Sequence, residues 1–196
     1  MPYFDVQING AAVACAGADD IQVLSAYVII APHGEASLGI HGMRLTDAGM
    51  EEHLSWKTPR VHRGDRIEIT YVLIGKATVS NSYLAPAVEP ETLVAELKKM
   101  GAELEARFRD TFPDGISPLK RLPEPIVLRV SAAGSSAVDA KLGNEEQLQA
   151  VLNATARDCV LEVDSLTVLE SGNTKGQRWL RQQVSPGQRI EMIYAT

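Results

Sequence analysis

The chain has 196 residues, of which 45% are hydrophobic and 22% charged, and its formal net charge is −6. This hydrophobic fraction is too high for a disordered chain, and a chain of this length can bury a core without metals or disulfides. No apolar run approaches the roughly 18 residues that a membrane span needs. The acidic balance argues against nucleic acid as a partner. We therefore predict a globular protein that binds neither nucleic acid nor membranes.

The N-terminal segment and the cysteines indicate the cellular compartment. The first basic residue is Arg44, so the positively charged start of a secretory signal peptide is not expected. Cys15 and Cys159 are too few for a disulfide framework and predict free thiols in a reducing compartment. We expect a cytoplasmic protein.

Alternation of apolar and polar residues predicts β structure in the first part of the chain. Residues 4–8 alternate as in a half-buried strand, and Asn9–Gly10 has the sequence of a tight hairpin turn. Further strands are predicted where β-branched residues or alternation continue, at 23–30, 37–44 and 65–73.

The middle of the chain predicts one helix over about 90–111. Pro90 suits a first helical position, and apolar residues then recur every three or four positions. They are Leu93, Leu97, Met100, Leu104 and Phe108. We expect this apolar stripe to pack on a β surface; the alternative is the groove of a partner.

The last part predicts strands again, at 127–130, 160–166 and 189–194. Between them we predict a short helix over 145–153. Asn144 would cap it, and Gln147 would reach back to the cap.

The chain also repeats itself. When it is shifted by 123 residues, 36–71 falls on 159–194 without a gap, with nine identities. The identical pairs are Leu38/Leu161, Gly49/Gly172, Trp56/Trp179, Val61/Val184, Gly64/Gly187, Arg66/Arg189, Ile67/Ile190, Glu68/Glu191 and Tyr71/Tyr194. The pattern indicates a tandem duplication.

These observations predict a mainly β protein made of two copies of a small sandwich-like unit joined by an amphipathic helix. The first unit spans 1–75, the connector 76–125 and the diverged second unit 126–196. The units are either separate domains or one pseudo-symmetric body like a fused homodimer. The alternative fold is a single α+β body with helices on a continuous sheet.

Part of the first unit resembles an uncharacterised family of small bacterial proteins with a Trp…Gly-Asp-x-Ile motif. The residues that carry this resemblance lie within 3–72. They are Asn9–Gly10, Ala16–Gly17, Asp19–Asp20, Val23–Leu24–Ser25–Ala26, Glu52–His53, Trp56, Val61 and Gly64–Asp65–Arg66–Ile67. The diverged second copy at about 126–196 has Gly176 in place of His53 and Gln188 in place of Asp65. The resemblance implies a fold unit and no activity.

The repeated residues have structural roles in our interpretation. We expect Trp56 and Trp179 to occupy one structural position as core anchors; a stacking platform for a sugar or base is the alternative. Gly64 and Gly187 would form turns before the strongest strands. Arg66 and Glu68, on one strand face, suggest a surface ion pair that the second unit repeats.

No catalytic, metal or cofactor signature is found. All four histidines, His33, His41, His53 and His62, lie in the first unit, but none has the spacing of a known zinc motif. The basic run Lys57, Arg60, His62 and Arg63 is either an anion site or a solvated loop.

We therefore expect a non-catalytic protein-interaction module, with one version a cytoplasmic inhibitor or immunity protein that masks a basic partner. Residues 1–75 hold nine acidic and five basic residues, which would steer such a partner. The candidate binding residues, expected in loops except for His53, are Asp19, Asp20, Glu35, Glu51, Glu52 and His53. The alternatives are a carbohydrate- or small-ligand-binding module with a groove between the units, and a hydrolase using His53 with Glu51 or Glu52. We expect a monomer with pseudo-two-fold symmetry or a weak dimer.

Overall fold

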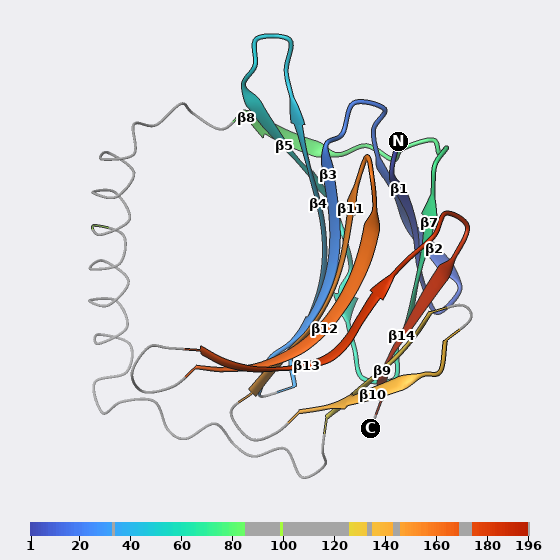
Figure 1. Ribbon diagram of the computed structural model, residues 1–196, viewed down its shortest axis with the longest axis vertical. Coiled ribbons are helices and arrows are strands. Elements are labelled where there is room, and N and C mark those ends of the chain that lie inside the picture. Colours follow the sequence, from blue (N-terminus) through green and yellow to red (C-terminus); the bar gives the residue numbers. More distant parts are fainter. Residues whose placement is uncertain are drawn as a thin grey trace. The chain divides into compact units, whose positions relative to one another are not determined.

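Two antiparallel sheets account for the architecture of the protein in a computed structural model, which describes residues 1–32, 34–84, 99, 126–132, 135–142, 146–168 and 174–195 (Figure 1). The first sheet has six strands in the order β10–β9–β14–β7–β1–β2. Its strands are β1 (Tyr3–Ile8), β2 (Ala11–Gly17), β7 (Arg66–Val72), β9 (Val127–Ala132), β10 (Val138–Lys141) and β14 (Arg189–Ala195).

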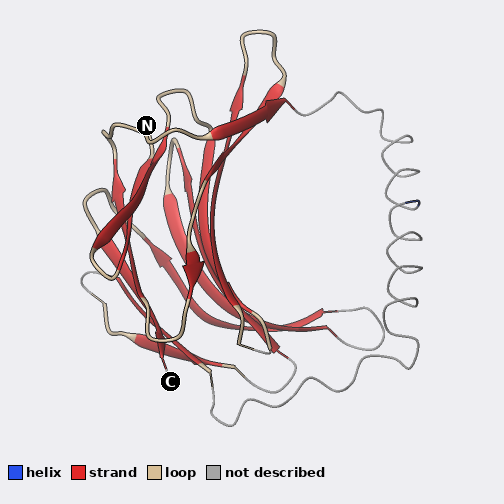
Figure 2. Cartoon of the chain, turned by 180° about the vertical axis from the view of Figure 1, so that it is seen from behind, coloured by secondary structure: helices blue, strands red, loops and turns tan. Residues whose placement is uncertain are grey.

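The second sheet has eight strands in the order β13–β12–β11–β3–β4–β5–β8, with β6 also paired with β4. It consists of β3 (Val23–Ile30), β4 (Ala36–Leu45), β5 (Glu51–Trp56), β6 (Arg60–Val61), β8 (Asn81–Leu84), β11 (Glu146–Thr155), β12 (Cys159–Val168) and β13 (Thr174–Gln183). The two sheets lie face to face as a sandwich (Figure 2). The mainly β prediction is therefore confirmed.

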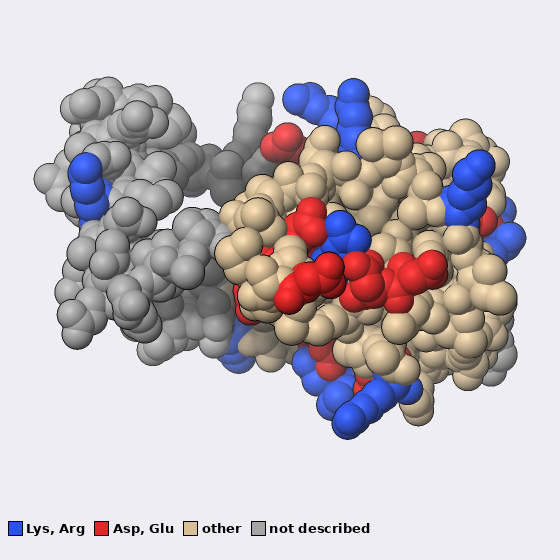
Figure 3. Space-filling view, turned by 90° about the horizontal axis from the view of Figure 1, so that it is seen from above, with Lys and Arg blue, Asp and Glu red and all other residues tan. Residues whose placement is uncertain are grey.

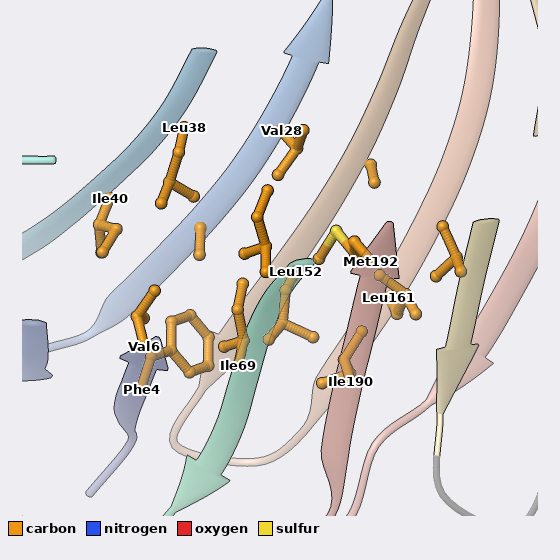
Figure 4. Close-up of a cluster of buried hydrophobic side chains, with 14 of the residues drawn as sticks. Phe4, Val6, Val28, Leu38, Ile40, Ile69, Leu152, Leu161, Ile190 and Met192 are labelled. Atoms are coloured by element: carbon orange, nitrogen blue, oxygen red, sulfur yellow. The ribbon is translucent and has the colours of Figure 1, made fainter. Parts of the chain in front are cut away.

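The core fills the space between the sheets because alternate residues of each strand point inward. Phe4, Ile69 and Ile190 come from the six-stranded sheet and meet Ile40 and Leu152 from the other sheet (Figure 4). All five side chains are fully buried.

The strands predicted from alternation are confirmed. The predicted hairpin turn is present as well: Asn9 and Gly10 have φ values of 53° and 78°, which the tight turn between β1 and β2 requires. The sequence analysis did not identify β2, β5, β6, β8, β10 or β13.

The short helix predicted at 145–153 is wrong, because these residues belong to strand β11. Leu148, Ala150, Leu152 and Ala154 are fully buried at every second position, which is the period of a strand. β11 pairs with β3 on one side and β12 on the other, so tertiary pairing overrides the local capping signal. The helix predicted at about 90–111 falls outside the described residues, Lys99 apart.

Both halves of the sequence contribute strands to both sheets. β7 pairs with β14 in the six-stranded sheet, and β3 pairs with β11 in the eight-stranded sheet. Residues 1–84 and 121–196 accordingly form one compact unit. At the centre of the β7–β14 pair, Glu68 lies directly opposite Glu191.

The repeated Arg-x-Glu residues form one shared ion cluster on this central pair instead of two separate surface pairs. Arg66 contacts both Glu68, at 3.0 Å, and Glu191 on the neighbouring strand. Arg189 contacts Glu68 at 2.6 Å. The Glu68 side chain is only 9% exposed, whereas that of Glu191 is 25% exposed. The cluster therefore compensates two like charges that the strand register places opposite each other.

The two predicted glycine turns are present and each contacts the other half of the chain. Gly64 and Gly187 have φ values of 92° and 83°. The Gly64 N–H donates to the carbonyl of Tyr194, and the Gly187 N–H donates to the carbonyl of Tyr71, both at 2.7 Å. Each turn is thus fixed against the strand that follows the other turn, β14 for Gly64 and β7 for Gly187.

The two tryptophans do not occupy the same position, contrary to the prediction. Trp56 pairs with Ile40, is 5% exposed and packs in the core. In β12 and β13 the register shifts between Val163 and Asp164, so that Leu180 pairs with Val163 and Trp179 falls in the bulge. Trp179 is half-buried and packs at the margin of the core.

We predict that Glu68→Gln lowers the free energy of unfolding by about 1–3 kcal/mol, because it removes the carboxylate charge that faces two arginines in a largely buried place. Glu191→Gln is the matched control and should cost clearly less, since its side chain is more exposed. Urea unfolding measures both variants. Equal losses would contradict a special role for Glu68.

We also predict that Gly64→Ala and Gly187→Ala each cost about 1–2 kcal/mol, because alanine resists a positive φ. An added Cβ at either position meets no atom within 4 Å, so backbone strain is the cause and the two losses should be similar. Thermal or urea unfolding of both variants tests this. A loss at one site alone would mean that the two turns differ in their contribution.

Candidate functional site

Acidic side chains gather at the end of the sandwich that carries the β2–β3 loop and the β4–β5 hairpin (Figure 3). We call this surface the acidic end; it consists of Asp19, Asp20, Asp47, Glu51 and Glu52. All are exposed except Glu52, which is half-buried. Glu51 and Glu52 begin strand β5 and do not lie in a loop as expected. Asp47, at the hairpin turn, was not identified from the sequence.

Arg44 is the basic residue that the structure places within the acidic end. Its guanidinium contacts Glu52 at 2.7 Å and Asp20 at 3.0 Å. Hydrogen bonds from Arg44 and Ser82 lower the pKa of Glu52 below its ordinary value. Glu52 and Asp20 therefore position Arg44, whereas Asp47 and Glu51 remain available to a partner.

Asp19 and Glu35 are the other two predicted acidic residues, and they lie in different parts of the structure. Asp19 accepts a hydrogen bond from the Tyr3 hydroxyl at 2.8 Å, which raises the pKa of Tyr3. Glu35 lies in the β3–β4 loop, at the opposite end of β4 from Glu51. Nine residue steps of a strand span about 30 Å, so Glu35 is not part of the acidic end.

His53 lies next to the acidic end on β5. Its ring stacks on Tyr83, with centroids 5.0 Å apart. The distance from His53 Nε2 to Glu51 Oε2 is 3.7 Å, which is longer than a hydrogen bond. The arrangement holds the ring by stacking rather than by a carboxylate that would orient it for proton transfer.

A second feature is an open groove of about 860 Å³ beside β2, which sequence reasoning did not identify. One wall is the edge of the six-stranded sheet, at residues Ala11–Val13, and the other is the Trp56–Arg60 segment that joins β5 to β6. The remaining lining residues are Ile8, Asn9, His62, Asp65, Thr78 and Val79. Two of the four residues in the predicted basic run, Lys57 and Arg60, lie on the same wall.

Asp65 is the acidic residue of the groove, and local hydrogen bonds fix it. Its carboxylate accepts from the backbone N–H of His62 and from the Asn9 amide, both at 2.7 Å. These bonds, the first above all, lower the pKa of Asp65. In the other half, Gln188 accepts from the Ser185 N–H in the same way at 2.7 Å. Asp65 therefore stabilises its turn, and Gln188 accepts the corresponding N–H in the other half.

The cysteine thiols show no sign of activation. Burial raises the pKa of Cys159 to about 12 and also raises that of Cys15. Across the described part of the chain, no group of three or more His, Cys, Asp or Glu side chains could hold a metal ion. No helix within that part is long and apolar enough to cross a membrane.

The acidic end and the groove are thus the two candidate binding surfaces among the described residues. The first combines carboxylates from the β2–β3 loop, the β4–β5 turn and the start of β5, and the second combines a free sheet edge with basic side chains. No family model, curated protein or solved structure matches the chain.

Proposed function

We propose that this protein is a non-catalytic protein-interaction module that binds a basic protein partner at the acidic end. The observation that carries the proposal is the excess of carboxylates there: the described residues of this surface hold five acidic side chains and one basic residue, Arg44, which pairs with two of them. Such an excess attracts a basic surface and accelerates association. One specific version is a cytoplasmic inhibitor, such as an immunity protein, that masks a basic toxin.

The scaffold supports this role through its symmetry. We propose that the chain is a tandem duplication folded as one body about a pseudo-two-fold axis between Glu68 and Glu191. An offset of 123 residues relates these two, and it also relates the reciprocal hydrogen bonds of Gly64 and Gly187. Since both halves share both sheets, the acidic end sits on a scaffold that does not need a second chain to complete its sheets.

A reducing compartment fits the two cysteines. Cys15 and Cys159 are free, and Cys159 is buried in the core. The cytoplasmic assignment rests on these thiols.

The two alternative functions have weaker support. A sugar-stacking platform requires an exposed aromatic face, but Trp56 is 5% exposed and donates its indole N–H to the Thr78 carbonyl at 3.1 Å. A His53–Glu51 acid/base pair requires a hydrogen bond, and the distance of 3.7 Å between the two side chains is too long for one.

The test uses Asp47 and Glu51, because substitution of Asp20 or Glu52 would also release Arg44. We predict that the wild-type protein captures a basic protein from its native cell extract at low salt. The variant Asp47→Lys/Glu51→Lys should capture much less of it. With the captured partner, stopped-flow measurements should show slower association and a weaker dependence of the rate on salt.

Glu35→Lys, compared with Glu51→Lys, is the matched control because both change the charge equally but lie at opposite ends of β4. It should leave association nearly unchanged. Equal effects of the two substitutions would mean that overall charge, and not the acidic end, governs binding. An unchanged rate in the Asp47/Glu51 variant would refute the proposal.

A further inference from the structure

We propose that the groove beside β2 binds an extended peptide segment of another protein that carries acidic side chains. This binding surface is separate from the acidic end and does not depend on the function proposed there. It is assigned from three properties of its walls: a free sheet edge, two cations without a described partner and a patch of exposed apolar surface.

The sheet edge is the first property. β2 is the last strand of its sheet, so the backbone groups on its outer side are available to another extended segment. The chain itself uses part of this edge: the Thr78 N–H and hydroxyl both donate to the Cys15 carbonyl, at 2.8 and 3.2 Å. Beyond that contact, at Ala11–Val13, no described strand covers the edge.

The side chains along this free part leave the backbone accessible. Ala11 and Ala12 are small and exposed, and neither carries the charge that commonly protects an edge strand. The register of β1 and β2 shifts between Val6 and Gln7, which leaves Val13 without a partner on β1. The bulge limits the ladder that a peptide can form here to a few residues. Specificity must therefore come from the peptide's side chains.

The facing wall supplies the charge. Lys57 and Arg60 are exposed, and neither forms an ion pair with any described residue. His62 lies beside them, and Asp65, the opposing charge, is held by Asn9 and the His62 N–H. The groove thus presents two free cations, which favour carboxylate side chains through charge-assisted hydrogen bonds.

Apolar surface completes the groove. Val79 is 95% exposed at the margin of the groove, and Pro59 is exposed on the wall that carries Lys57. An exposed valine gains from contact with an apolar side chain of a bound segment. The volume of about 860 Å³ lies in the range of binding clefts. Alternating acidic and apolar side chains therefore match the groove best.

The experiment uses a capped peptide, acetyl-Val-Glu-Val-Glu-Val-Thr-amide, and its analogue with lysine in place of both glutamates. The protein is the full chain with Trp179→Phe, so that emission reports Trp56, which lines the groove. We expect saturable binding of the acidic peptide only, with amide chemical-shift changes concentrated at Ala11–Val13. Lys57→Glu/Arg60→Glu should raise the dissociation constant of the acidic peptide about tenfold or more. A tenfold change corresponds to about 1.4 kcal/mol of binding free energy.

The matched control is Arg157→Glu/Lys175→Glu, which makes the same charge change at two exposed residues outside the groove. It should retain the affinity within about twofold, in line with the small effect of distant exposed charges. If the groove variant fails to fold, Lys57→Gln/Arg60→Gln gives a smaller loss in the same direction. The proposal would be overturned if the acidic and the lysine peptide bound equally, or if the groove variant and the control variant lost the same affinity. It would also be overturned if succinate displaced the peptide with an affinity equal to that of the peptide itself.

Discussion

The antiparallel pairing of β7 with β14 joins the two halves of the six-stranded sheet, and its register places Glu68 opposite Glu191. Two carboxylates on facing strands repel each other, so this register needs the cations that Arg66 and Arg189 bring from the same two strands. The turns at Gly64 and Gly187 bond across the same pair. Strand pairing, charge compensation and turn geometry thus specify one register together.

This central pair also explains where the functional surfaces lie. With the two halves joined through β7–β14 and β3–β11, the outer strands of each half become the free edges of the sandwich. β2 is such an edge, and the groove forms between it and the β5–β6 segment. The acidic end forms where the β2–β3 loop meets the β4–β5 hairpin. The proposed basic partner and the proposed acidic peptide would therefore bind different parts of the same half.

Among the described residues, the second half differs from the first around the groove, and the reason is local. A register shift in β12–β13 places Trp179 in a bulge, whereas Trp56 stays in the core and donates to Thr78. The Asp65 turn is matched by Gln188, which accepts the equivalent N–H without a charge. Residues that hold the fold are thus repeated, whereas the charges and the tryptophan position beside the groove differ between the halves.

The sequence by itself determined the β class, strands β1, β3, β4 and β7 of the first half and the Asn9–Gly10 turn, because alternation and turn chemistry are local properties. It also identified the residues of the acidic end, Asp47 apart, and the repeated glycines, but not their neighbours. Tertiary structure decided that β11 is a strand, since burial between β3 and β12 outweighs a capping signal. It also decided that Glu35 lies apart from Glu51, that Arg44 holds Glu52, and that Ala11–Val13 face Lys57 and Arg60. These relations join residues distant in sequence, so only the pairing of strands could establish them.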